Sequence, residues 1–369
     1  MRRLRFAMAV PVATVLGVGA LMSASGNPSA PAETRESRNV SAEERKALLT
    51  RAQVWSPPAV ESNRGHPTTA QSFVECKFIV TDLGGTAQKF DCVLDSGEQI
   101  RVKYGRTPEI PSEIAATGLL RLLGFGADEV RPVARLRCHG CPAEPFLTAK
   151  AADATNTQEY FKKLVRYDNH KDFKRVAVER KHHGQPITSD GVKGWAFHEL
   201  DQIDANRGGA PGAHVDALRL MAVLLAHWDN KSENQRLVCL SDWNEGESCQ
   251  QPFALLQDVG AAFGPKKVDL TAWERTPIWT NRAQCTTDMA TLPYDGATFA
   301  PVTITEAGRQ HLGAGLRRVS DDQLRQLFAS ARFDEPRFFP RSRTGALDDW
   351  MRVFKQKVSA ITDGPACPS

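Results

Sequence analysis

Residues 227–234 read HWDNKSEN, and residues 257–264 read QDVGAAFG. The first stretch follows an apolar run at 213–226, in which large apolar residues recur at the spacing of one helix face. Two strand-like runs with a polar turn between them separate the two stretches. The sequence therefore predicts a buried helix, a loop rich in polar side chains, and a hairpin that ends at a second polar loop.

The polar residues of these stretches match a known catalytic pattern. His227, Asp229 and Asn234 occupy the positions of the conserved letters in the protein-kinase catalytic loop H-R-D-L-x-x-x-N, and Asp258-x-Gly260 follows as it does in such enzymes. Phosphoryl transfer requires an aspartate that orients or deprotonates the attacking hydroxyl, and an asparagine and a second aspartate that hold metal. Surface loops contain a lone Asp-x-x-x-x-Asn by chance, so residues upstream provide an independent test.

A kinase also needs a lysine on a strand and a carboxylate on the following helix. Residues 99–103 read QIRVK and supply Lys103 on a predicted strand. The predicted helix at 108–123 then supplies Glu113, with Glu109 as a competing partner. The four elements thus occur in the order that kinases use.

The catalytic segment resembles the protein-kinase-like superfamily, and within it the atypical branches: the secreted Golgi casein kinase family, CotH-like spore-coat kinases and HipA-like kinases. The resemblance spans residues 75–300 in outline. It implies that Lys103 contacts the phosphates of ATP, that Glu113 pairs with Lys103, and that Asp229 is the catalytic base. It also implies that Asn234 and Asp258 bind Mg²⁺ or Mn²⁺.

The sequence departs from conventional protein kinases in two places. It has no G-x-G-x-x-G loop, so Gly84 and Gly85, followed by Thr86, are the candidate cover for the phosphates, and a plain hairpin turn is the alternative. It also has no A-P-E segment after Asp258. The second departure is compatible with the atypical branches.

The resemblance and the pattern of runs together predict an α+β, bilobal, protein-kinase-like fold. We expect an N-terminal lobe made of an antiparallel sheet with one helix at 71–193, and a mainly helical C-terminal lobe with the catalytic loop at 194–369. Residues 1–26 are predicted to be a signal peptide, because three arginines precede an apolar run and small residues follow it. Residues 27–70 are predicted to be a mostly disordered linker, interrupted by one short helix that starts at a Ser41–Glu44 capping box.

Individual elements follow from local patterns. Strands are expected in the N-terminal lobe, and helices later in the chain, the second of them capped by Ser320. The expected strands are 73–81, 89–94, 99–104, 130–137, 146–150 and 176–181, and the expected helices are 213–226, 321–330 and 347–361.

A signal peptide implies an oxidising compartment, in which the eight cysteines are best interpreted as disulfides. Cys76 and Cys92 lie in two neighbouring strand-like runs, and Cys239 and Cys249 flank the polar turn of the later hairpin. Cys138 and Cys141 form a C-x-x-C, for which a local disulfide is favoured over half a zinc site or a redox pair. The two cysteines that remain, at 285 and 367, then pair with each other.

Composition limits the classes of function. The 369 residues include 47 Lys and Arg against 43 Asp and Glu, and a net charge of +4 excludes a strongly basic nucleic-acid binder. A segment at 162–183 is locally basic and suits either an acidic substrate or simple solvation. We expect a monomer that is secreted or periplasmic, with no nucleic-acid partner and no stable membrane insertion after signal removal.

The sequence therefore predicts an exported, metal- and ATP-dependent phosphotransferase, which acts on a protein or a small molecule that the sequence does not identify. Two alternatives stay open. One is a catalytically inactive kinase-like module that binds a partner, and the other is a kinase fold that transfers another group, such as AMP.

Overall fold

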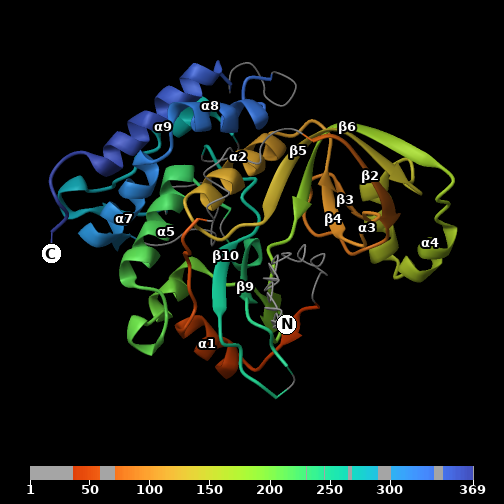
Figure 1. The fold of residues 1–369 in the computed structure, drawn as a ribbon, viewed down its shortest axis with the longest axis horizontal. Helices are drawn as coiled ribbons and strands as arrows, with labels where there is room; N and C mark the ends of the chain where they lie inside the picture. Colours follow the sequence, from red (N-terminus) through yellow and green to blue (C-terminus); the bar gives the residue numbers. More distant parts are fainter. Residues whose placement is uncertain are drawn as a thin grey trace, which may run out of the picture. The chain divides into compact units, whose positions relative to one another are not determined.

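The structure is a computed structural model, and it describes residues 36–58, 71–229, 231–244, 246–264, 268–289, 301–335 and 344–368. These residues form two β-structures and a set of helices, which confirms the predicted α+β class. Figure 1 shows the two β-structures next to one another, with most of the later helices on the opposite side from α3 and α4. The predicted signal peptide lies outside the described residues, and so do residues 27–35 and 59–70 of the predicted linker.

The first β-structure is a closed five-stranded barrel. Its strands are connected in the order β2-β3-β4-β6-β5, and every pair is antiparallel except β2 with β5. Alternate side chains of these strands point inward, where aromatic and branched residues such as Phe78, Phe90 and Val176 form a separate core. The strands are β2 (Gln71–Ile79), β3 (Lys89–Val93), β4 (Gln99–Lys103), β5 (Glu129–His139) and β6 (His170–Arg180).

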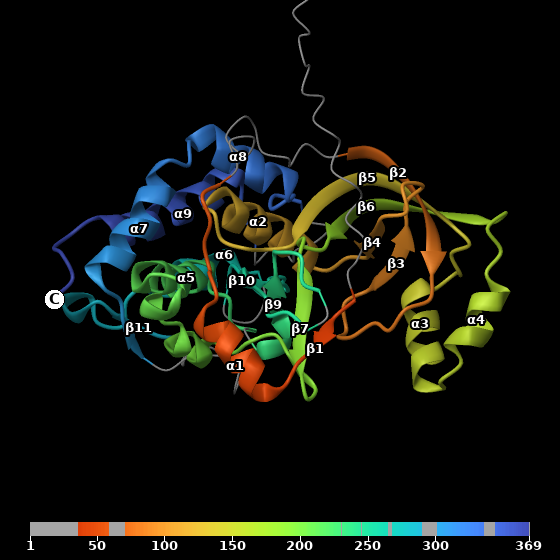
Figure 2. The ribbon, with the colours of Figure 1, turned by 60° about the horizontal axis from the view of Figure 1, so that its bottom comes forward.

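Three helices accompany the barrel. The buried helix α2 (Glu109–Leu122) connects β4 to β5, as predicted, and its apolar residues pack into the large core of the later part of the chain. Two further helices, α3 (Pro145–Ala154) and α4 (Gln158–Leu164), lie side by side between β5 and β6 (Figure 2). The strand predicted at 146–150 is therefore wrong. Pro145 starts a helix there, and alanines continue it, because both suit helical backbone better than a strand.

The second β-structure is an open sheet in the order β1-β7-β9-β10, with β8 paired to β7. Its strands are β1 (Arg38–Asn39), β7 (Gln185–Ser189), β8 (Val192–Lys193), β9 (Gln235–Cys239) and β10 (Pro252–Leu256). Because β7 and β8 hydrogen-bond within this sheet, they do not belong with the barrel, although the predicted lobe boundary at 193 placed them there. Residues 32–369 together form one compact unit.

Part of the predicted linker is folded. The short helix predicted at Ser41 exists as α1 (Ala42–Thr50), and the Ser41 hydroxyl accepts a hydrogen bond from the Glu44 backbone. The residues around it are also ordered, because β1 pairs with β7, and Leu48 and Leu49 are buried in the large core. The linker interpretation is therefore wrong for 36–58, where two adjacent leucines bury enough apolar surface to fix the segment.

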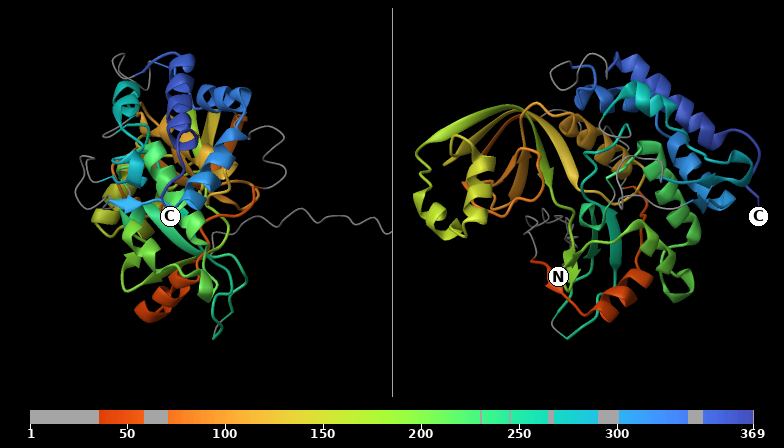
Figure 3. Two further views of the ribbon diagram at one scale, coloured as in Figure 1. Left: turned by 90° about the vertical axis from the view of Figure 1, so that its left-hand side faces the viewer. Right: turned by 180° about the vertical axis from the view of Figure 1, so that it is seen from behind.

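The long helix α5 (Gly212–Leu225) is buried along most of its length, and among the remaining helices α7 (Glu306–Arg317) packs beside it (Figure 3). Ser320 is the N-cap of helix α8, as predicted, and it also forms a capping box with Gln323. The other helices and strands of this part are α6 (Leu270–Arg275), α7 (Glu306–Arg317), α8 (Asp321–Ser330), α9 (Leu347–Thr362), β11 (Thr286–Thr287) and β12 (Val302–Thr303). Short 3₁₀ turns lie at η2 (Phe197–Gln202), η3 (Ala205–Arg207), η4 (Ser232–Asn234) and η5 (Arg282–Gln284).

Four disulfides cross-link the described residues, and they are the four pairs that the sequence predicts: Cys76–Cys92, Cys138–Cys141, Cys239–Cys249 and Cys285–Cys367. No helix within the described ranges is long and apolar enough to span a membrane.

Candidate active site

The catalytic segment lies between the end of α5 and the start of β9. Helix α5 ends at Ala226, whose left-handed backbone (φ 50°) turns the chain sharply away from the helix axis. The backbone N–H of His227 still bonds back to the helix, and its buried imidazole hydrogen-bonds the backbone of Ala261. His227 therefore holds the catalytic segment against the loop that follows β10.

The β9–β10 hairpin brings the second polar stretch back to the first. The backbone N–H of Asp258 donates to the carbonyl of Asn234 at 3.0 Å, so the two residues are direct neighbours. The Asn234 amide in turn donates to the backbone carbonyl of Asp229 at 2.6 Å. Asp229 and Asn234 thus meet Asp258, from a later part of the chain, at one end of a hairpin that the Cys239–Cys249 disulfide cross-links.

These three residues line one cavity of about 400 Å³. Its opposite wall comes from the β2–β3 loop and the start of β3, which contribute Gly85 and Lys89. The β2–β3 loop also contributes Thr86 and Ala87. The remaining lining consists of Glu109 of α2 and of Trp228, Lys231, Gly260, Ala261 and Val268. The cavity therefore has carboxylates on one side and a lysine beneath a glycine turn on the other.

Lys103 and Glu113 meet as the sequence predicts, but behind this cavity rather than in its lining. The Lys103 Nζ lies 2.5 Å from Glu113 Oε1, and both side chains are buried. A second carboxylate, Glu179 of β6, lies 3.2 Å from the same Nζ and also pairs with Lys181. The competing residue Glu109 instead lines the cavity. The ammonium of Lys103 is therefore buried, with two carboxylates already within ion-pair distance of it.

The charges in this cluster set the protonation of its members. Burial would lower the pKa of Lys103, but Glu113 and Glu179 outweigh burial and hold that pKa well above its ordinary value. Burial raises the pKa of Glu113 to about 8, and repulsion from Asp258 and Glu179 adds to this rise against the opposing effect of Lys103. Burial also opposes ionisation of Asp258, but Lys103 and Lys89 outweigh it and lower the pKa of that carboxyl. Asp258 is thus an anion at neutral pH.

The two predicted glycines have different positions. Gly85 lines the cavity and adopts a left-handed backbone (φ +70°), which glycine reaches at no steric cost. A Cβ at this position would lie 3.3 Å from the Lys89 Nζ, so the turn passes directly over that ammonium. Gly84 is not among the residues that line the cavity, and a Cβ there would meet open space.

Sequence reasoning missed Lys89 and Glu179. Lys89 lies directly opposite Lys103 in the β3–β4 hairpin, so the register of that hairpin would have placed both lysines at the same end. Burial and the charge of Lys103 lower the pKa of Lys89, and no carboxylate lies within ion-pair distance of it in the described part of the chain. Glu179 reaches Lys103 from a strand far away in sequence, and no local motif marks it.

The described residues contain no group of three or more His, Cys, Asp and Glu that could hold a metal ion by themselves. Asp258 and Asn234 are therefore the metal-ligand candidates that the geometry brings together. Cys138 and Cys141 form a disulfide, so they provide no thiolate for the zinc half-site that the sequence left open.

Two solved structures are similar to this chain. One is the Helicobacter pylori proinflammatory kinase CtkA, with a TM-score of 0.44 and 12% sequence identity over 80% of this chain and 97% of that one. The other is a Golgi casein kinase with Mn and ADP bound, with a TM-score of 0.35 and 12% identity over 88% of this chain and 83% of that one. Both of these proteins are named as kinases. No protein-family model and no curated protein matches the sequence.

Proposed function

We propose that this chain is a metal- and ATP-dependent phosphotransferase of the atypical kinase type. One observation carries the proposal: a single cavity joins Asp229, Asn234 and Asp258 with an unpaired Lys89 beneath the Gly85 turn. Phosphoryl transfer depends mainly on positioning and on stabilising charge, and these residues supply a metal-binding pair, a cation for phosphate and a carboxylate for the acceptor.

Asn234 and Asp258 fit a divalent metal. Asp258 is ionised, and the Asn234 amide nitrogen is engaged with the Asp229 carbonyl, which leaves the amide oxygen for a ligand. Mg²⁺ is commonly held by one or two protein oxygens together with substrate phosphates, so an Asp–Asn pair suits Mg²⁺ or Mn²⁺. When bound, such an ion would neutralise the charge of the transferring phosphate.

Lys89 is the residue that we assign to the phosphates. Its ammonium lines the cavity without a carboxylate partner in the described ranges, whereas Lys103 is enclosed by Glu113 and Glu179. A buried cation without a counter-ion is favourable only if an anion can reach it. Lys103 then acts indirectly, because it holds Glu113 in place and lowers the pKa of Asp258.

Asp229 is placed to orient the acceptor. Its carboxylate lines the cavity and lies 3.5 Å from the Lys231 Nζ, on a partly exposed side chain that an incoming hydroxyl can reach. A carboxylate in this position can accept the proton of that hydroxyl as the phosphate is transferred.

The test is transfer of label from ATP. The disulfide-bonded protein is incubated with Mg²⁺ or Mn²⁺ and with ATP labelled at either the α- or the γ-phosphate, and dephosphorylated casein and the protein itself serve as acceptors. Transfer of the γ-label that is lost in Asp258→Ala and Asp229→Ala, and retained in the surface variant Lys355→Ala, supports the proposal. Transfer of the α-label would instead identify AMP transfer. No transfer and no nucleotide binding would favour the inactive binding module.

We also propose that the protein works outside the cytoplasm. The N-terminal run at 1–26 has the three-part pattern of a signal peptide, and all eight cysteines are paired in the four disulfides. Fractionation of expressing cells, followed by N-terminal sequencing of the mature protein, tests this placement. A cytoplasmic protein with an intact N-terminus would contradict it.

A further inference from the structure

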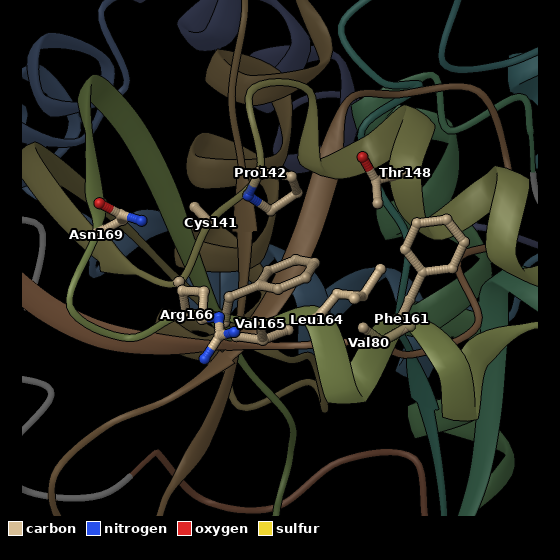
Figure 4. A pocket seen from close by; sticks show the side chains of 11 residues that line it. Val80, Cys141, Pro142, Thr148, Phe161, Leu164, Val165, Arg166 and Asn169 are labelled. Atoms are coloured by element: carbon tan, nitrogen blue, oxygen red, sulfur yellow. The ribbon is translucent and has the colours of Figure 1, made fainter.

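A second cavity, of about 350 Å³, lies between the end of strand β2 and the helices α3 and α4 (Figure 4). Its walls come from the end of β2, from the loop that the Cys138–Cys141 disulfide closes, and from α3, α4 and the turn after α4. Most of the wall is apolar and includes Phe78, Val80, Phe161 and Leu164. Cavities of this size with apolar walls and a few polar groups are typical of binding sites.

Exposed apolar side chains lie on the helices and the turn that line the cavity, and Leu164 is itself part of the lining. Helix α4 buries none of its residues, and its Tyr160 and Leu164 are 62% and 51% exposed. Leu147 on α3 and Tyr167 after α4 are exposed to a similar degree. These four side chains are most of the large exposed apolar side chains in the described ranges. A small molecule confined to the cavity would leave several of the four exposed to solvent. A polypeptide segment could cover them together.

The charge beside the cavity is positive. Arg166 lines the cavity, and among the described residues it makes no ion pair. The other charged residues of α4 and of the turn after it are Lys162, which pairs with Glu159, Lys163 and Asp168, so the segment carries one cation in excess. This part of the basic segment at 162–183 thus presents cations beside an apolar hollow, which is complementary to acidic residues that flank a bulky apolar side chain.

The same helices hold the loop that covers the active-site cavity. The Lys150 ammonium of α3 donates to the carbonyl of Leu83 at 3.1 Å, and the Gln158 amide of α4 donates to Asp82 Oδ1 at 3.1 Å. The two accepting residues, Asp82 and Leu83, directly precede Gly84 and Gly85. A ligand that packs against α3 and α4 therefore contacts the elements that position the glycine turn over Lys89.

We propose that the cavity between β2, α3 and α4 is a docking site for an acidic segment of a protein acceptor that carries one bulky apolar side chain, and that its occupation steadies the loop at 82–89. The apolar side chain enters the cavity, and the flanking carboxylates meet Arg166. This inference rests on the proposed function, because it assigns the acceptor of that reaction to the class of acidic protein segments.

The test uses fluorescein-labelled peptides EEFEE, EEAEE and KKFKK and the full disulfide-bonded chain, with binding followed by fluorescence anisotropy. We expect EEFEE to bind at least about tenfold more tightly than either of the other two peptides. Arg166→Glu and Leu164→Glu, both at exposed positions, should each weaken the binding of EEFEE by about tenfold. The control Lys355→Glu on α9 should leave that affinity unchanged. Saturating EEFEE should tighten ATP binding about fivefold.

Each of several results would overturn the docking site. Equal binding of EEFEE and EEAEE would show that no apolar side chain enters the cavity. An unchanged affinity of Arg166→Glu for EEFEE would show that the carboxylates of the peptide do not meet Arg166. Binding to anionic phosphatidylserine vesicles but not to EEFEE would assign the surface to a membrane. An unchanged ATP affinity would break the link to the loop at 82–89. Asp258→Ala should bind EEFEE normally, so loss of phosphotransfer and loss of docking are separate outcomes.

Discussion

The substitution Lys103→Met removes one cation from a buried cluster of carboxylates. Lys103 Nζ lies 2.5 Å from Glu113 and 3.2 Å from Glu179, and none of these side chains is more than 8% exposed. Loss of one partner from a buried pair costs about 3–5 kcal/mol. Lys181 still pairs with Glu179, and Glu113, whose pKa burial raises to about 8 even beside Lys103, is neutral at pH 7 once that cation is gone. We therefore expect the lower end of that range, about 3 kcal/mol.

The assay is urea unfolding at pH 7 without reductant, followed by tryptophan fluorescence. The matched control is Lys355→Met, which breaks the exposed Lys355–Asp321 pair and should cost about 0.5 kcal/mol or less. The double variant Lys103→Met, Glu113→Gln should recover about 1 kcal/mol or more relative to the sum of the single changes. A cost for Lys103→Met no larger than that of the control would refute the interpretation of Lys103 as the centre of a buried ion cluster.

Three further predictions follow from individual contacts. Lys89→Met should weaken ATP binding by roughly tenfold to a hundredfold, as measured by calorimetry, because a charge-assisted contact to phosphate is lost, and Lys355→Met should leave the affinity unchanged. Burial and His183 lower the pKa of His182 from 6.5 to about 4, so the free energy of unfolding should fall by about 2–3 kcal/mol as the pH drops from 6.5 to 4. Denaturation measured at several pH values should show a shallower fall for His182→Gln than for the unchanged protein. Identical curves would contradict the assignment. Replacing Cys239 and Cys249 by serine should lower the free energy of unfolding by about 2.5–3 kcal/mol, because the unfolded chain gains entropy when the 10-residue loop is no longer cross-linked. A change below about 0.5 kcal/mol in thermal unfolding would argue against the bridge.

The sequence predicted those parts of the fold and site that depend on local pattern. The spacing of apolar residues identified α5, Ser320 as an N-cap identified the start of α8, and the hairpin cysteines identified two disulfides. The catalytic pattern also predicted that Asp258 and Asn234 would meet, because a hairpin returns the chain to its starting point.

Contacts between distant strands were not accessible in the same way. Glu179 reaches Lys103 only because β6 pairs with β4 in a closed barrel, and strand order cannot be inferred from the composition of the strands. For the same reason Lys89 was not recognised as a cavity residue, although it lies opposite Lys103. The segment at 146–150 was assigned to a strand because short apolar runs do not distinguish a strand from a helix.

The central claim is that Asp258, Asn234 and Lys89 form one site for a metal–nucleotide complex. Calorimetric titration of ATP into the disulfide-bonded protein, with Mg²⁺ or Mn²⁺ and then with EDTA, tests it most directly. We predict saturable binding that requires the metal and that is lost in Asp258→Ala but retained in Lys355→Ala. Binding of equal strength in EDTA, or in Asp258→Ala with metal present, would contradict the claim.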